Sequence, residues 1–124
     1  MLILINPPQI MSKQEEKITL YLNEFKNSLK IKVDEDLLTK VTKGLGPSIY
    51  NADASKVSGS DAKELETVKN NFLIKKLGLS ASDKLDEAIT EVMDQMGSSN
   101  RNKYRAMVYY LLVLKFKKQS VYNS

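Results

Sequence analysis

The chain has 124 residues, of which 42% are hydrophobic and 27% are charged, and its formal net charge is +4 at pH 7. These values are typical of one soluble globular domain. The sequence contains neither cysteine nor histidine, which excludes disulfides, thiolate zinc sites, cysteine nucleophiles and histidine bases.

The first ten residues differ in character from the rest of the chain. Residues 1–5 are apolar and are followed by Pro7 and Pro8, and this run is too short for a signal peptide or a membrane span. Charged, helix-forming sequence begins at Met11. We therefore expect residues 1–10 to be a non-native or disordered extension, residues 11–124 to form a single helical domain, and the protein to be cytoplasmic.

Two helices are predicted in the first third of the chain. Ser12 and Glu15 have the spacing of a capping box, which predicts a helix over residues 12–31 with an apolar stripe along one face. The acidic run that starts at Asp34 suits the positive end of a second helix. Gly44 is expected to end this helix, and the Gly-Pro pair that follows prevents its continuation.

A polar loop over residues 44–60 separates these helices from two more. Asp61 has the character of an N-cap and predicts a third helix, which Gly78 ends. Residues 80–83 are expected to open a fourth helix, which ends at Gly97.

The last helix is the most apolar segment of the chain. Ser98 or Ser99 is expected to cap it, and only two residues from Tyr104 to Phe116 are charged. A helix that is apolar on most faces is buried by its neighbours. The sequence therefore predicts an all-α fold, a compact single-domain bundle of about five helices around an apolar C-terminal helix.

Positive charge is concentrated at the C-terminal end. Residues 97–124 hold six basic residues and no acidic one, whereas the preceding residues hold 13 basic and 15 acidic ones. The three lysines near the end of the last helix agree with its macrodipole. Arg101, Lys103 and Arg105 lie near its expected start, where the macrodipole disfavours cations, so we expect acidic neighbours or an anionic ligand there.

Four blocks of sequence resemble a known family. They are GPSIYNAD at residues 46–53, VKNNFLIKKLG at residues 68–78, SNRNKYRA at residues 99–106 and YYLL at residues 109–112. Together they resemble a family of small bacterial helical proteins, domain of unknown function 2853, over about residues 12–122. The resemblance implies a compact helical fold and assigns no activity and no functional residue.

The strongest candidate site is a group that can bind an anion. Its residues are Ser98, Ser99, Arg101, Lys103 and Arg105. The start of a helix offers free N–H groups to an anion, and two arginines four residues apart on one face can grip a phosphate. In the alternative interpretation the serines only cap the helix, and the arginines pair with acids such as Asp83, Asp86 or Asp94.

A second candidate lies in the loop that precedes the third helix. Its residues are Ser48, Tyr50, Asn51 and Asp53. Polar groups on a loop held by rigid helices can converge on a small ligand. The same residues also fit ordinary turn chemistry. A calcium loop is excluded, because Lys56 and Ala62 stand where such a loop needs glycine and glutamate.

No catalytic, cofactor-binding or metal-binding motif is present in the sequence, so we expect a protein that is not an enzyme and has no cofactor. The preferred hypothesis is a small non-catalytic interaction module that binds a protein partner or forms a homodimer through an exposed part of its apolar last helix. The alternative hypothesis is weak binding of nucleic acid or another polyanion through Arg101, Lys103 and Arg105. No membrane association is expected.

Overall fold

The computed structural model describes residues 12–122, and all regular secondary structure in that range is helical. The predicted all-α class is therefore confirmed. None of the helices between residues 12 and 122 has the length and apolar character needed to cross a membrane. The prediction that residues 1–10 are a non-native or disordered extension concerns residues outside the described range.

Helix α1 (Lys13–Glu24) begins at the predicted capping box. The Ser12 hydroxyl accepts a hydrogen bond from the Glu15 N–H, and the Glu15 carboxylate accepts one from the Ser12 N–H, both at 3.1 Å. The helix continues into the π-helical segment η1 (Phe25–Leu29) and ends where Lys30 adopts a left-handed φ of 55°. The helix predicted over residues 12–31 is thus confirmed.

Helix α2 (Glu35–Leu45) starts at Asp34, whose carboxylate accepts a hydrogen bond from a first-turn N–H. Gly44 was expected to end this helix, but it lies inside it. The helix ends at Gly46, whose φ of +66° is a conformation that glycine adopts without strain. A short 3-10 turn, η2 (Gly46–Tyr50), leads into the loop.

Helix α3 (Ala62–Thr67) starts at the predicted cap, because the Asp61 carboxylate accepts from the N–H groups of the first turn. It continues without a break into the π-helical segment η3 (Val68–Lys76). Helix α4 (Asp83–Met96) ends at the expected glycine, Gly97, which has a φ of +105°.

Helix α5 (Arg105–Lys115) begins later than its sequence predicted. Its N-cap is Tyr104, so the prediction that Ser98 or Ser99 caps it is wrong. The intervening residues form a turn, in which the side chain of Asn100 donates to the Met96 carbonyl oxygen at 2.9 Å and accepts from a backbone N–H two residues ahead at 2.7 Å. A short 3-10 turn, η4 (Gln119–Tyr122), follows α5.

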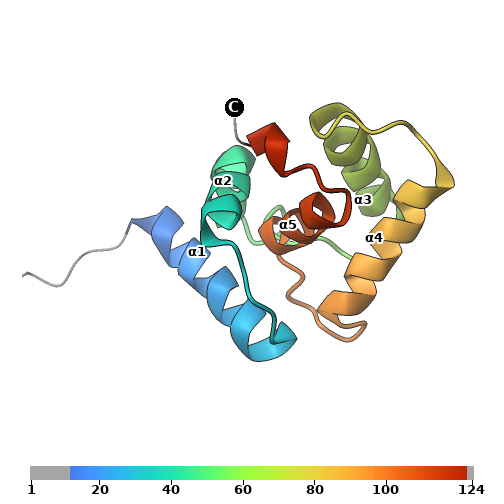
Figure 1. The fold of residues 1–124 in the computed structure, drawn as a ribbon. Coiled ribbons are helices and arrows are strands. Elements are labelled where there is room, and N and C mark those ends of the chain that lie inside the picture. The colour runs from blue at the N-terminus through green and yellow to red at the C-terminus, as the bar shows by residue number, and fades with distance from the viewer. Residues whose placement is uncertain (1–11, 123–124) are drawn as a thin grey trace, which may run out of the picture.

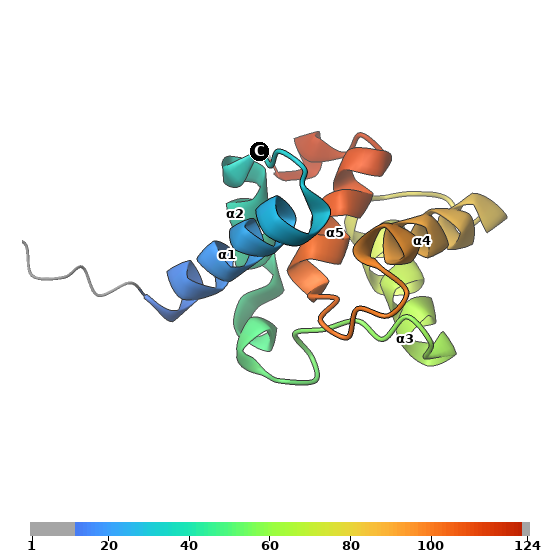
Figure 2. The ribbon, with the colours of Figure 1, turned by 90° about the horizontal axis from the view of Figure 1, so that it is seen from below.

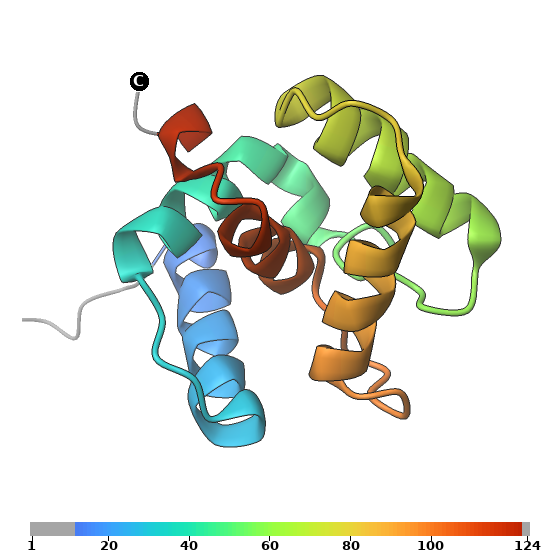
Figure 3. The same cartoon turned by 45° about the vertical axis from the view of Figure 1, so that its right-hand side comes forward.

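The described elements are arranged around α5, as predicted. Helices α1 and α2 lie on one side of it, and α3 and α4 lie on the other (Figures 1 and 3). All eight residues from Ala106 to Val113 are buried. The hydroxyl of Tyr110 accepts a hydrogen bond of 2.8 Å from the Asp34 N–H, which fixes the start of α2 against α5. The central helix α5 thus organises the core. Its first turn lies between the α1–α2 side and the α3–α4 side of the molecule.

Candidate functional site

Two segments that are distant in sequence meet at the start of α5 (Figure 2). The Val57 N–H donates to the Lys103 carbonyl oxygen at 2.8 Å, and the Arg105 N–H donates to the Ser55 carbonyl oxygen at 2.7 Å. An isolated antiparallel bridge joins Lys56 to Tyr104 between these two bonds. The loop therefore covers the first turn of α5, and the N–H that would face an anion at Arg105 is already bonded.

The two predicted candidate sites line one cleft of about 1210 Å³. All five residues of the basic candidate contribute to its wall, and so do Asn51 and Asp53 from the loop candidate. Ser48 and Tyr50 are not part of it. The Ser48 hydroxyl donates to the Leu45 carbonyl oxygen at 3.0 Å, and the Tyr50 side chain lies at the surface, 46% exposed.

Hydrogen bonds typical of a turn fix the loop that contains the second candidate site. The Asn51 side-chain oxygen accepts from the N–H groups of Asp53 and Ala54, both at 2.8 Å, which makes it the organiser of the turn. The Asp53 side chain is exposed and has no hydrogen bond among residues 12–122. Of the four predicted loop residues, only these two face the cleft, and Asn51 is committed to the backbone.

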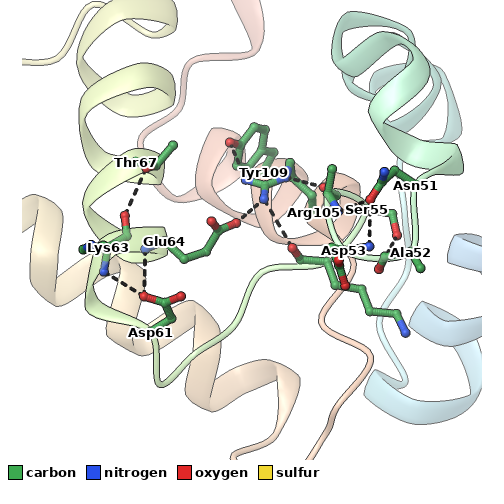
Figure 4. A network of polar contacts seen from close by, with 12 residues as sticks. Asn51, Ala52, Asp53, Ser55, Asp61, Lys63, Glu64, Thr67, Arg105 and Tyr109 are labelled. Carbon is green, nitrogen blue, oxygen red and sulfur yellow. Dashed lines mark hydrogen bonds and ion pairs between the residues drawn. The ribbon is translucent and has the colours of Figure 1, made fainter.

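Arg105 joins the loop, α3 and α5 (Figure 4). Its Nε donates to the Ala54 carbonyl oxygen at 2.8 Å, and its Nη1 donates to the Tyr109 hydroxyl at 3.1 Å. Its Nη2 donates to the Lys56 carbonyl oxygen at 3.2 Å and forms an ion pair with Glu64. Every nitrogen of the guanidinium therefore has a partner within the protein, which agrees with the alternative interpretation of internal pairing and gives little support to phosphate binding at Arg105.

The electrostatics of this network favour the charged arginine. Burial alone lowers the pKa of Arg105, but the hydrogen bonds and charges of Tyr109 and Glu64 outweigh it and leave the pKa raised. Burial also raises the pKa of Tyr109, whose ring stacks on Phe72 with centroids 3.8 Å apart. Arg105 therefore stays charged, and its contacts hold the loop and α3 to the start of α5.

The acidic partner of Arg105 was not anticipated from the sequence. Asp83, Asp86 and Asp94 were expected, and Glu64 takes this role instead. Asp86 of α4 pairs with Lys69 of η3 at 3.1 Å. The only related signal in the sequence was the cap pattern at Asp61. It correctly predicted the start of α3, and Glu64 lies in the first turn of that helix.

Arg101 and Lys103 differ sharply in their surroundings. Arg101 is exposed and has no ion pair or hydrogen bond within residues 12–122. Lys103 is buried, with 7% of its surface exposed, and its Nζ donates to the Asn100 carbonyl oxygen at 2.6 Å. None of the described carboxylates lies within ion-pair distance of this ammonium group. Lys103 is therefore a buried cation at the cleft wall without a counter-charge.

The stem of Lys103 packs beneath the loop. A Cβ placed on Gly59 would lie 3.7 Å from its Cε and 3.8 Å from the sulfur of Met93. Ser58 and Ser60, on either side of this glycine, have hydroxyl oxygens 3.5 Å apart and line the same cleft. Sequence reasoning missed these serines, because only the tertiary fold brings them to the lysine.

Charges of both signs line the cleft in equal number. The basic residues are Lys56, Arg101, Lys103 and Arg105, and the acidic residues are Asp53, Asp61, Glu64 and Asp94. Between residues 12 and 122 no group of three or more acidic side chains could hold a metal ion. The arrangement suits a polar ligand that carries a single anionic group better than it suits a polyanion.

Comparison with known proteins gives a family and no activity. A family model described as "Protein of unknown function (DUF2853)" matches residues 20–120. None of the curated proteins matches the chain. The cleft lies wholly within the matched range, and α2, α3, α4 and α5 do too.

Proposed function

The chain belongs to the DUF2853 family of proteins of unknown function, and because that description states no activity, we propose a function from the geometry of the cleft. The protein is a non-catalytic interaction module, and the cleft receives an acidic side chain from a polar segment of a protein partner. The observation that carries this proposal is Lys103, a residue only 7% exposed, whose ammonium group lines the cleft and has no carboxylate partner within residues 12–122.

An uncompensated buried cation is costly for a folded protein. Removing an ammonium group from water costs several kcal/mol unless a charged or polar partner replaces the lost hydration. Lys103 has one carbonyl partner for its three N–H donors. A carboxylate that enters the cleft would supply both the missing charge and a further acceptor. Exposed Arg101 and the hydroxyls of Ser58 and Ser60 lie on the same cleft and would hold its other oxygen.

The size and lining of the cleft favour a chain segment over a small metabolite. Small-molecule sites usually occupy about 300–1,000 Å³ and are mainly apolar. This cleft is larger, at about 1210 Å³, and most of the residues around it are polar or charged. A segment with alternating charges would also meet the acids Asp61 and Asp94 on the cleft wall.

The contacts of the cleft and of α5 favour one of the hypotheses drawn from the sequence over the others. A polyanion at the start of α5 has little support, because Arg105 is occupied, Lys103 is buried, and four acids line the same cleft. Self-association through an exposed part of the last helix also has little support, because residues 106–113 are buried. A protein partner at the cleft is the version of the interaction module that these contacts favour.

The test is a titration of isotope-labelled protein with the blocked pentapeptide Lys-Ser-Glu-Ser-Lys, followed by NMR. Amide signals of residues 56–61 and 98–103 are expected to shift and to saturate at millimolar peptide. The same peptide with glutamine in place of glutamate should bind at least about tenfold more weakly, since a charge-assisted hydrogen bond contributes about 1.5–3 kcal/mol. Equal binding of both peptides would contradict the proposal.

Two variants of the protein make the test specific. Lys103→Met keeps the length of the side chain and removes the charge, so it should abolish peptide binding while the free energy of unfolding stays unchanged or rises. Lys32→Met removes an exposed lysine outside the cleft and should bind as the unaltered protein does. Undiminished binding by Lys103→Met, or shifts caused by inorganic phosphate with none from the peptide, would overturn the proposal.

A further inference from the structure

The end of the molecule opposite to the cleft carries a separate group of cations. The C-terminal ends of α2, η3 and α5 converge there around Tyr122. The Lys76 ammonium lies 5.2 Å from the centroid of the Tyr122 ring, and a Cβ on Gly44 would lie 3.7 Å from its Cε1. Segment η4, which contains Tyr122, packs against α2. Three helix ends that are distant in sequence therefore meet at one aromatic ring.

Five lysines belong to these helix ends, and we call them the basic end. They are Lys43, Lys75, Lys76, Lys117 and Lys118. Four of them are exposed, Lys118 is partly exposed, and none has a carboxylate partner among residues 12–122. Lys115 pairs with Glu91 and is therefore left out.

The segments that make up the basic end contain no acid at all. Residues 37–52, 67–82 and 95–122 hold no aspartate or glutamate. The acids of α2 lie in its first turn, those of α3 are Glu64 and Glu66, and those of α4 are spread along the helix. Glu91 of α4 does reach the end of α5, where it pairs with Lys115. The lysines of the three helix ends that meet at Tyr122 lie in segments without acids of their own.

Helix macrodipoles do not cancel this charge. A helix C-terminus carries about half a negative elementary charge, so three of them contribute about −1.5. The five lysines contribute +5. A net positive charge of about +3.5 therefore remains at the basic end. This charge is more than the stabilisation of the helix ends requires, and it is exposed to water.

We infer that the basic end binds the phosphate backbone of duplex nucleic acid, without reading its sequence. Lysine ammonium groups act as point charges on phosphates, whereas base reading in the major groove most often uses arginine or amide forks, which the basic end lacks. A duplex presents about one phosphate charge per 1.7 Å of its axis, so several can lie against one small patch.

Other anionic surfaces fit less well. Stacking of single-stranded bases requires an accessible aromatic face, and the ring of Tyr122 packs against Lys76 and lies beside Gly44. Insertion into a membrane surface requires exposed apolar side chains, and within residues 12–122 the only large one is Tyr50, which belongs to η2. The inference is independent of the cleft, because the 11-residue helix α5 separates the two places by about 16 Å.

Fluorescence anisotropy with a labelled DNA duplex of about 20 base pairs tests the inference, at salt concentrations between about 25 and 200 mM. The double variants Lys75→Gln/Lys76→Gln and Lys117→Gln/Lys118→Gln should each weaken binding about tenfold at the lowest salt. Each should also lower the slope of log K against log salt by about 2, since each lysine on a phosphate contributes about 1. The thermal melting point of Lys117→Gln/Lys118→Gln should stay unchanged, and that of Lys75→Gln/Lys76→Gln should fall only slightly, because the contact of Lys76 with the Tyr122 ring is lost.

A matched double variant, Lys26→Gln/Lys32→Gln, removes the same charge from exposed positions outside the basic end and should keep the affinity of the unaltered protein. Lys103→Met should also keep it. The inference is overturned if the unaltered protein does not bind the duplex at low salt, or if the matched variant loses as much affinity as the other two. Tighter binding to a single-stranded oligonucleotide or to phosphatidylserine vesicles would equally overturn it.

Discussion

Tyr21 is a buried residue of α1 whose hydroxyl has no hydrogen-bond partner among residues 12–122. Its ring lies 5.3 Å from that of Tyr104, centroid to centroid. Burial, with smaller contributions from Tyr104 and Tyr50, raises the pKa of Tyr21 from 10.0 to about 12. An unfolded chain therefore ionises this phenol at lower pH than the folded protein does. The stability that this group provides is complete below pH 10 and is lost between pH 10 and about 12.

We predict that Tyr21→Phe stabilises the protein. At neutral pH the free energy of unfolding should rise by about 1 kcal/mol, because an unpaired buried hydroxyl is removed without loss of ring packing. As the pH rises from 10 to beyond 12, the variant should lose about 3 kcal/mol less than the unaltered protein, since two pKa units correspond to that free energy. Urea unfolding at a series of pH values measures both effects. A destabilised variant at neutral pH would show that the hydroxyl has a partner.

The residue scale also separates two cations that the sequence grouped together. Arg105 uses all its nitrogens within the protein, whereas Lys103 leaves its charge unpaired. Only the second is available for the acidic ligand that we propose. The two residues lie two positions apart, and their sequence gave no indication of this difference. The difference depends on Glu64 from α3 and on the loop carbonyls, which bond Arg105 alone.

At the scale of elements, Arg105 connects the loop, α3 and α5. We predict that Arg105→Lys lowers the free energy of unfolding by about 1–2 kcal/mol, because an ammonium group cannot reproduce the fork that bonds two carbonyls, a hydroxyl and a carboxylate. Arg105→Met should lower it by about 3 kcal/mol, since Glu64 then lies partly buried without a partner.

Urea unfolding of these variants and of Glu64→Gln gives the comparison. The double variant Arg105→Met/Glu64→Gln should be more stable than the sum of the single losses predicts, because the orphaned carboxylate is also removed. Additive losses would mean that the two side chains do not interact.

Helix starts show where local rules were sufficient. Ser12, Asp34 and Asp61 each cap the helix that their sequence pattern predicted. A side-chain cap acts over three residues, so its pattern is readable in sequence. Helix α5 departs from this rule, because the Arg105 N–H is bonded by a carbonyl fifty residues away, at Ser55. Such a bond replaces the cap and moves the start of the helix beyond Ser99.

At the scale of the whole molecule, the fold buries its large apolar side chains almost completely. Among residues 12–122, Tyr50 is the one large apolar side chain that is exposed. We predict that the protein is a monomer at about 100 μM, because dimers of useful stability need a larger apolar patch. Light scattering after size exclusion measures this. A dimer at that concentration would show that the molecule has an interface that these contacts do not reveal.

The two ends of α5 have different characters, and this difference belongs to the whole molecule. At its start, charges of both signs line a cleft around the buried Lys103. Beyond its end, Lys76 lies over the Tyr122 ring, and five lysines of the helix ends that meet there have no carboxylate partner among residues 12–122. The net charge of +4 shows neither feature, because it is a sum over the whole chain and does not tell where on the surface each charge lies.

The sequence by itself determined the helical class, the central position of the last helix and most helix boundaries. These follow from apolar periodicity, caps and glycines, and such signals act between residues a few positions apart. The tertiary structure alone decided which charges meet. Glu64 reaches Arg105 from 41 positions away, and Lys76 reaches Tyr122 from 46. Pairings over such separations depend on how the helices pack around α5, and no local pattern records that packing.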